Sequence, residues 1–304
     1  MGTSPPFSSR TTSSSIGRPN LSPLSPSPSP SRLWRPAAQR NIRNQWSKLL
    51  SSKDRWFSAS SEGRSHATAL VNAYLSQKYM PEMDLGVLKE MDGIRKKACF
   101  KLARKQEFYR SKLLSSYKDM VIAVTDLVKA SGSMRCYLKG SGSSTMIQYS
   151  SLPENQSDPG DGGGLPVFSC LSISILEDLA SELVHMFISE LSLKRLLVID
   201  LISIICMEDG GEDSLLSWSN ELYDGEFDCL RSNGMLVSDF CYPIHPQIMD
   251  WPPSDPLNRT LIKSHNSDVF QVYLTTWLVD VNIDMHRVDE IFSMVQEEMR
   301  VTLR

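Results

Sequence analysis

The stretch 172–206 constrains the fold more than any other part of the chain, because it is both strongly apolar and periodic. Its seam residues recur at alternating steps of three and four, the pattern of a long helix packed against other helices. This seam consists of Leu176, Leu179, Leu183, Met186, Glu190, Leu193, Leu197, Asp200 and Ile204. A membrane-spanning helix needs roughly 18 residues with few charges, so the charges here argue against a membrane protein. We predict a third long helix within 167–206.

A charged band crosses the middle of this predicted helix. It consists of Glu190, Lys194 and Arg195. Glu190 and Lys194 are one turn apart and can pair with each other, whereas Arg195 lies off the Leu193–Leu197 stripe. Two interpretations stay open: the charges satisfy one another, or they contact a partner protein. From this spacing we predict that Lys194 and Arg195 face a partner, so that reversing both charges leaves folding nearly intact.

Two further long helices are expected earlier in the chain and would form a helical hairpin over 37–138. The first begins after Pro36 and carries the seam residues Ile42, Trp46 and Leu49, but it can bend or break near Gly63. The second covers about 94–131, and its seam consists of Leu113, Tyr117, Met120, Val124 and Leu127. The fold class that follows is all-α: a coiled-coil-like bundle of long helices.

The remaining segments have the composition of connections and of a helical end. Residues 139–166 are rich in Gly, Ser and Pro and predict a flexible linker. Residues 207–268 form an acidic insertion, expected to be irregular apart from a short helix at 215–222. Residues 269–304 are expected to complete the bundle with helices at about 269–279 and 284–300, the second capped by Asp284. One face of this last helix carries Val288, Ile291, Phe292, Val295 and Met299.

Basic residues gather at the start of the second helix, within 95–112, where Glu107 is the single acid. The basic face there consists of Lys96, Lys97, Lys101, Arg104 and Lys105. Such a face, with Phe100 and Phe108 interleaved, can bind nucleic acid. It can also be a solvated surface, or a match for the acidic insertion 207–268 within the same chain.

The first 36 residues are rich in Ser, Thr and Pro and hold no acidic residue. This composition predicts a disordered tail. The Ser-Pro steps at Ser25, Ser27 and Ser29 are candidate sites for a proline-directed kinase, and Ser29 is the best of them because Arg32 follows. The same composition is typical of an organelle transit peptide, so a cleaved leader for a chloroplast or mitochondrion is the alternative.

The sequence offers little for catalysis. The six cysteines have no CxxC spacing, and the glycine-rich stretches 140–144 and 160–164 lack the Lys-Ser/Thr of a phosphate-binding loop. We therefore expect a protein that is not an enzyme and that has no metal and no cofactor.

Three segments resemble the cyclin-dependent kinase 2-interacting protein family, in a form similar to its plant members. LPVFSCLSISILEDLASELVHMFISELSLKRLLVIDLIS (165–203) carries a Leu-Pro-x-Phe start and Glu190-Leu191 before Leu193-Lys194-Arg195. NIRNQWSKLL (41–50) resembles the family's N-terminal helix, with Trp46 in place. YLTTWLVDV (273–281) resembles its C-terminal Tyr-Leu-x-x-Trp-Leu segment.

The resemblance implies a non-catalytic adaptor. It implies roles in DNA replication and in cell-cycle and DNA-damage checkpoint signalling, with cell-cycle kinases and checkpoint factors as partners. It also implies association with a chromatin-linked AAA ATPase assembly that remodels replisomes and pre-ribosomes. The implied location is the nucleus, with shuttling to the cytoplasm left open. The tail 1–36 and the insertion 207–268 lie outside the resemblance.

Overall fold

A computed structural model of the chain describes residues 2, 30–139, 149–153, 158–204, 216–237, 242–248, 267–301 and 303. Helices account for 69% of the described residues, which confirms the all-α fold class. Ser25, Ser27, Ser29 and half of the acidic insertion 207–268 lie outside the described residues, so the predictions for them stay predictions.

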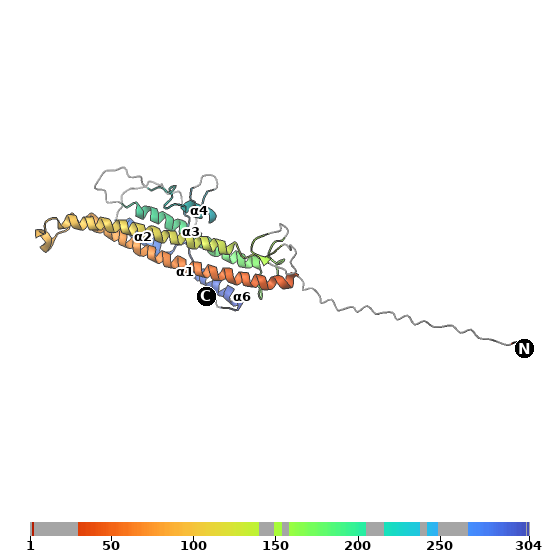
Figure 1. The fold of residues 1–304 in the computed structure, drawn as a ribbon. Helices are drawn as coiled ribbons and strands as arrows, with labels where there is room; N and C mark the ends of the chain where they lie inside the picture. Colours follow the sequence, from red (N-terminus) through yellow and green to blue (C-terminus); the bar gives the residue numbers. More distant parts are fainter. Residues whose placement is uncertain are drawn as a thin grey trace.

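Two long helices form the backbone of the bundle. α1 (Pro30–Tyr79) and α2 (Ile94–Ser131) lie side by side along their lengths and are joined by a short connection with the 3₁₀ turn η1 (Gly86–Glu90) (Figure 1). Their predicted seams are buried: Trp46 and Leu49 of α1 and Leu113 and Tyr117 of α2 are fully inaccessible. The periodicity of three and four therefore identified the face that each helix buries.

The other helices pack around this hairpin. α3 (Ile173–Ile202) lies along α2, the short α4 (Glu226–Ser232) packs on α2, and α5 (Ser267–Val279) contacts α1 and α3. α6 (Met285–Met299) contacts α3, and its apolar face is buried. The predicted cap is present, because the Asp284 carboxylate accepts hydrogen bonds from the backbone N–H groups of His286 (3.0 Å) and Arg287 (3.2 Å).

α1 begins earlier than predicted and contains Pro36. The expected boundary at 36 is wrong because tertiary contacts hold the residues before it. The indole Nε1 of Trp34 donates to the carbonyl of Cys136 (3.0 Å), and Nε of Arg35 donates to the carbonyl of Val167 (2.9 Å). Because these contacts anchor the first turns of α1, the helix tolerates the loss of the backbone hydrogen bond that Pro36 cannot donate.

α1 also runs unbroken through Gly63, where a bend or break had been expected. The glycine is buried under a neighbouring side chain instead. A Cβ at this position would lie 2.7 Å from Cζ2 of Trp277, and the same indole donates from Nε1 to the carbonyl of Ser60 (3.0 Å). Gly63 thus provides the space in which Trp277 of α5 docks onto α1.

Replacing Gly63 with Ala should destabilise the protein by about 1–2 kcal/mol. Alanine favours a helix over glycine by about 1 kcal/mol, but the added methyl group clashes with a packed indole, and overpacking costs about 1–3 kcal/mol. Urea unfolding followed by circular dichroism measures the change. In a Trp277→Leu background the clash is gone, so the same substitution should become neutral or stabilising. A gain in stability in the wild-type background would contradict this packing.

Three other segments differ from their predictions. The short helix expected at 215–222 is absent among the described residues 216–222, and α4 begins at Glu226 instead. A small antiparallel pair joins β1 (Tyr137–Leu138), just before the linker, to β2 (Tyr149–Ser150) within it. Part of the linker's glycine-rich stretch is packed, because a Cβ at Gly160 would clash with the ring of Tyr137 and a Cβ at Gly162 with the ring of Trp34, whereas Gly163 and Gly164 are exposed. Composition alone therefore overstated the flexibility of the described part of 139–166.

Candidate functional site

Arg195 of α3 lies in a buried cluster with Glu226 of α4 and Tyr117 of α2, called here the Arg195 cluster. The side chains of Arg195 and Glu226 are 0% exposed. Nε of Arg195 donates to Oε1 of Glu226 (2.8 Å), and Nη2 donates to Oε2 (3.3 Å). The phenol of Tyr117 donates to the same Oε1 (2.7 Å). Burial and the Glu226 charge hold the pKa of Tyr117 well above its usual value, so the phenol stays a hydrogen-bond donor.

The rest of the Arg195 guanidinium holds the chain that precedes α4. Nη1 donates to the carbonyl of Trp218 (2.8 Å) and Nη2 to the carbonyl of Asn220 (2.7 Å). The guanidinium also stacks over the Trp218 ring, with Cζ 4.7 Å from the centroid. All of these contacts are internal to the chain. They tie the described part of the acidic insertion to α3.

Lys194 lies in a second buried cluster, called here the Lys194 cluster, with Glu190, Asp280 and Asn282. Its Nζ donates to the carbonyl of Trp277 (2.6 Å), near the end of α5. The same Nζ lies 2.8 Å from Oε1 of Glu190 and 2.8 Å from Oδ1 of Asp280, where opposite charges attract without a well-aligned hydrogen bond. The side chains of Lys194 and Glu190 are 0% exposed.

The Lys194 cluster fixes the connection between α5 and α6. Oε2 of Glu190 accepts hydrogen bonds from the backbone N–H (2.9 Å) and the Nδ2 (3.3 Å) of Asn282. Asp280 has a backbone φ of 45°, a left-handed conformation that Asp tolerates better than most residues. This turn brings its carboxylate to Lys194. A cation at this position also interacts favourably with the carbonyl end of α5.

The prediction that Lys194 and Arg195 face a partner is therefore wrong. Both side chains are buried within the chain itself, and α3 is covered on this side by α4 and by the α5–α6 connection. The alternative for Glu190 and Lys194, pairing one turn apart, is the arrangement found. The expectation that reversing both charges leaves folding nearly intact is also withdrawn, because that expectation assumed that the two charges lie at the surface.

Sequence reasoning missed the two acids that pair with the cations of this band, Glu226 and Asp280, and the hydrogen bond that Tyr117 donates to Glu226. A signal was present for Glu226. It is flanked by Tyr223, Phe227 and Leu230, and an acid within an apolar pattern is a candidate for burial against a cation. Asp280 had no comparable signal, because its role depends on a left-handed turn that the sequence does not specify.

The basic face of α2 is exposed along its length. Lys96, Lys97, Lys101, Arg104 and Lys105 all point to solvent. None of the five forms an ion pair with any residue that the structure describes. The proposed match with the acidic insertion is not seen among the described residues, since Glu226 pairs with Arg195 instead.

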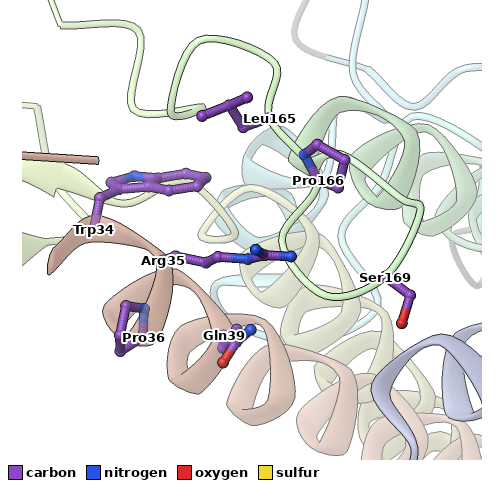
Figure 2. Close-up of a pocket in the computed structure, with 7 residues that line it drawn as sticks. All are labelled: Trp34, Arg35, Pro36, Gln39, Leu165, Pro166 and Ser169. Atoms are coloured by element: carbon purple, nitrogen blue, oxygen red, sulfur yellow. The ribbon is translucent and has the colours of Figure 1, made fainter. Parts of the chain in front are cut away.

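A surface pocket of about 590 Å³ lies where α1 begins (Figure 2). Trp34, Arg35, Pro36 and Gln39 of α1 face Leu165, Pro166 and Ser169 of the segment before α3. The polar groups on the α1 side hold that segment in place: Gln39 Nε2 donates to the carbonyl of Val167 (2.8 Å), and Arg35 donates to the carbonyls of Val167 and Phe168. Leu165 and Pro166 of the Leu-Pro-x-Phe start thus form part of one wall of the pocket.

The far side of this segment is held by Glu298 of α6. Its Oε1 accepts hydrogen bonds from three consecutive backbone N–H groups, those of Ser169 (2.7 Å), Cys170 (2.6 Å) and Leu171 (2.9 Å). Partial burial opposes ionisation, but these three hydrogen bonds outweigh it and lower the pKa of Glu298 below its usual value. The carboxylate is therefore the form that stabilises the fold.

Replacing Glu298 with Gln should destabilise the protein by about 1–2 kcal/mol near neutral pH, because a charge-assisted acceptor becomes a neutral one. A folded pKa below the unfolded value means that the carboxylate stabilises the fold above about pH 4.3 and that this contribution is lost as pH falls further. The difference in melting temperature between wild type and variant should thus be constant near neutral pH and shrink in acid. A pH-independent difference would contradict the role of the charge.

Searches for other kinds of site in the described residues gave no candidate. No group of three or more His, Cys, Asp or Glu side chains there is placed to hold a metal ion. No described helix is long and apolar enough to cross a membrane. In comparisons with known proteins, the chain matches no family model, and no curated protein matches it either.

Proposed function

We propose that this protein is a non-catalytic helical adaptor of the kind represented by the cyclin-dependent kinase 2-interacting protein family. Its role would lie in DNA replication, in cell-cycle and checkpoint signalling, and in a chromatin-associated AAA ATPase assembly that remodels replisomes and pre-ribosomes. The location that follows is the nucleus, with shuttling to the cytoplasm open.

The observation that carries the proposal is that the three resembling segments meet in one core. Trp277, from 273–281, receives a hydrogen bond at its carbonyl from Lys194, from 165–203. Arg43, from 41–50, stacks over the ring of Phe168, from 165–203, with Cζ 5.0 Å from the centroid, and Trp46 and Trp277 belong to the same hydrophobic core. The segments that carry the resemblance thus specify a shared scaffold, and the partner-binding role is left to exposed surfaces such as the basic face.

Affinity purification of the full-length protein from its own cells, after nuclease treatment, tests this function. We expect cell-cycle kinases or subunits of an AAA ATPase to remain bound. Partners that disappear on nuclease treatment would favour the alternative, a nucleic-acid-binding protein. Mass spectrometry of the N-terminus in the same sample provides a second readout: a chain cleaved near residue 36 would overturn the nuclear assignment in favour of an organelle protein.

A further inference from the structure

The distal end of the α1–α2 hairpin has no covering layer in the described structure. This end projects beyond the other helices (Figure 1). No side chain from residue 75 to residue 105 is buried, and the first buried residue of α2 is Gln106. The lysine and aromatic side chains of this end therefore lie on a part of the helix pair that contributes no fully buried residue to the core of the bundle.

This distal surface is unusually apolar for a region without a covering layer. The exposed fractions are 94% for Val87, 65% for Phe100 and 55% for Phe108. Three more large apolar side chains are exposed beside Val87, namely Met83, Leu88 and Met91. Nη2 of Arg95 donates to the carbonyl of Met83 (2.6 Å), which holds the hairpin tip against the start of α2. Grouped apolar side chains of this kind mark interaction sites.

The same surface is basic. Lys97, Lys101 and Lys105 recur at steps of four, so they form one row on α2, next to the row of Phe100, Arg104 and Phe108. The two phenylalanines are eight residues apart, or about 12 Å along the helix axis. An amphipathic helix presents apolar anchors two turns apart at closely similar spacing. Acidic side chains beside those anchors would meet the lysine row.

We propose that this distal surface docks an acidic amphipathic helix of a partner protein. The charge of the lysine row selects acidic flanks, and the two rings supply sites for apolar anchors. A nucleic acid could use the cations and stack on Phe100 and Phe108, but it would leave the aliphatic and Met side chains of the tip uncovered. Those side chains favour a protein partner, because Met-containing apolar surfaces adapt well to other apolar side chains.

The inference rests on the proposed adaptor function and is tested separately from it with purified full-length protein. The probe is a fluorescein-labelled synthetic helical peptide with leucines in a heptad seam and glutamates on both flanks. Two matched peptides carry lysines in place of the glutamates or serines in place of the leucines. A single-stranded RNA of similar length is the nucleic-acid probe. Fluorescence anisotropy at low ionic strength gives the affinities.

We expect the acidic peptide to bind more tightly than both matched peptides and the RNA. The triple variant Lys97→Glu/Lys101→Glu/Lys105→Glu should lower the affinity for the acidic peptide by about tenfold or more, because like charges then oppose each other. The control Arg40→Glu/Lys48→Glu/Lys129→Glu makes the same change of charge at exposed positions away from the distal end and should leave affinity unchanged.

The double variant Phe100→Ala/Phe108→Ala should also lower the affinity for the acidic peptide by about tenfold or more, since it removes both aromatic rings that the apolar anchors would contact. All replaced side chains are exposed, so unchanged circular dichroism melts should accompany each loss. Three results would overturn the proposal: no binding of the acidic peptide, equal binding of the serine peptide, or tighter binding of RNA that the triple reversal abolishes. Failure here leaves nuclease-resistant co-purification unaffected, because an adaptor can use another surface.

Discussion

Arg195→Met should destabilise the protein by about 3–5 kcal/mol, the cost of leaving a buried charge without its partner. Among the described residues, the Glu226 carboxylate would keep only the Tyr117 phenol and the backbone N–H of Leu222 (2.7 Å) as donors. The carbonyls of Trp218 and Asn220 would lose their donor as well. Urea unfolding followed by circular dichroism gives the change in free energy.

The control for this prediction removes both charges. Arg195→Met/Glu226→Met should be less destabilised than the sum of the two single variants, by up to about 3 kcal/mol, because groups in contact couple. An exposed arginine would behave differently: Arg195→Met would then shift stability by about half a kcal/mol or less. Additive single variants would likewise contradict the Arg195 cluster.

Lys194→Met should cost a comparable amount, about 3–5 kcal/mol, because one substitution leaves the carboxylates of Glu190 and Asp280 without a cation. The carbonyl of Trp277 loses its hydrogen bond at the same time. The same unfolding experiment measures the loss. The loss should be concentrated in the docking of α5 and α6, so hydrogen exchange of their backbone amides should accelerate more than that of α2.

Two comparisons test the origin of this effect. Lys101→Met changes the same residue type on the exposed basic face and should shift stability by about half a kcal/mol or less. Adding Glu190→Gln and Asp280→Asn to Lys194→Met removes the excess negative charge and should restore part of the lost stability. Equal effects of Lys194→Met and Lys101→Met would show that Lys194 does not sit in a buried cluster.

Every helix except α4 was predictable, because the repeating apolar seam that marks it can be recognised from local sequence spacing alone. α2 matches its predicted bounds, and the apolar face of α6, with Val288 and Phe292, is buried as expected. Features that depend on distant contacts were not predictable. Pro36 lies within a helix because the side chains of Trp34 and Arg35 donate hydrogen bonds to the carbonyls of Cys136 and Val167. Both carbonyls lie about 100 residues or more away in the sequence.

The charged band shows the same limit at the candidate site. Helical spacing placed Lys194 one turn from Glu190 and Arg195 off the Leu193–Leu197 stripe, and the side of a helix away from its seam is normally solvated. Here it is covered by a second layer that includes α4, which the sequence showed as part of an acidic, proline-rich segment. An unusually apolar helix that carries cations is better interpreted as buried on several sides, with acids elsewhere as counterions.

The two buried clusters fix which segments can pack on α3. Buried ion pairs often contribute little net stability compared with apolar side chains of similar size. As a hypothesis, their value here is specificity: only a segment with an acid at the correct position can cover Arg195 or Lys194. The double variant Arg195→Met/Glu226→Met separates stability from specificity. It should change the free energy of unfolding only a little, but it should loosen the packing of α4 on the bundle.

The most direct test of the central claim, that Lys194 is an internal structural residue while the lysines of the basic face are available to partners, is chemical labelling of the native protein. Brief acylation with a water-soluble amine reagent, followed by mass spectrometry, gives a labelling rate for each lysine. Lys96, Lys97, Lys101 and Lys105 should label rapidly. Lys194, with a side chain that is 0% exposed, should label only when the protein unfolds. Labelling of Lys194 at the rate of Lys101 in the folded protein would contradict the account.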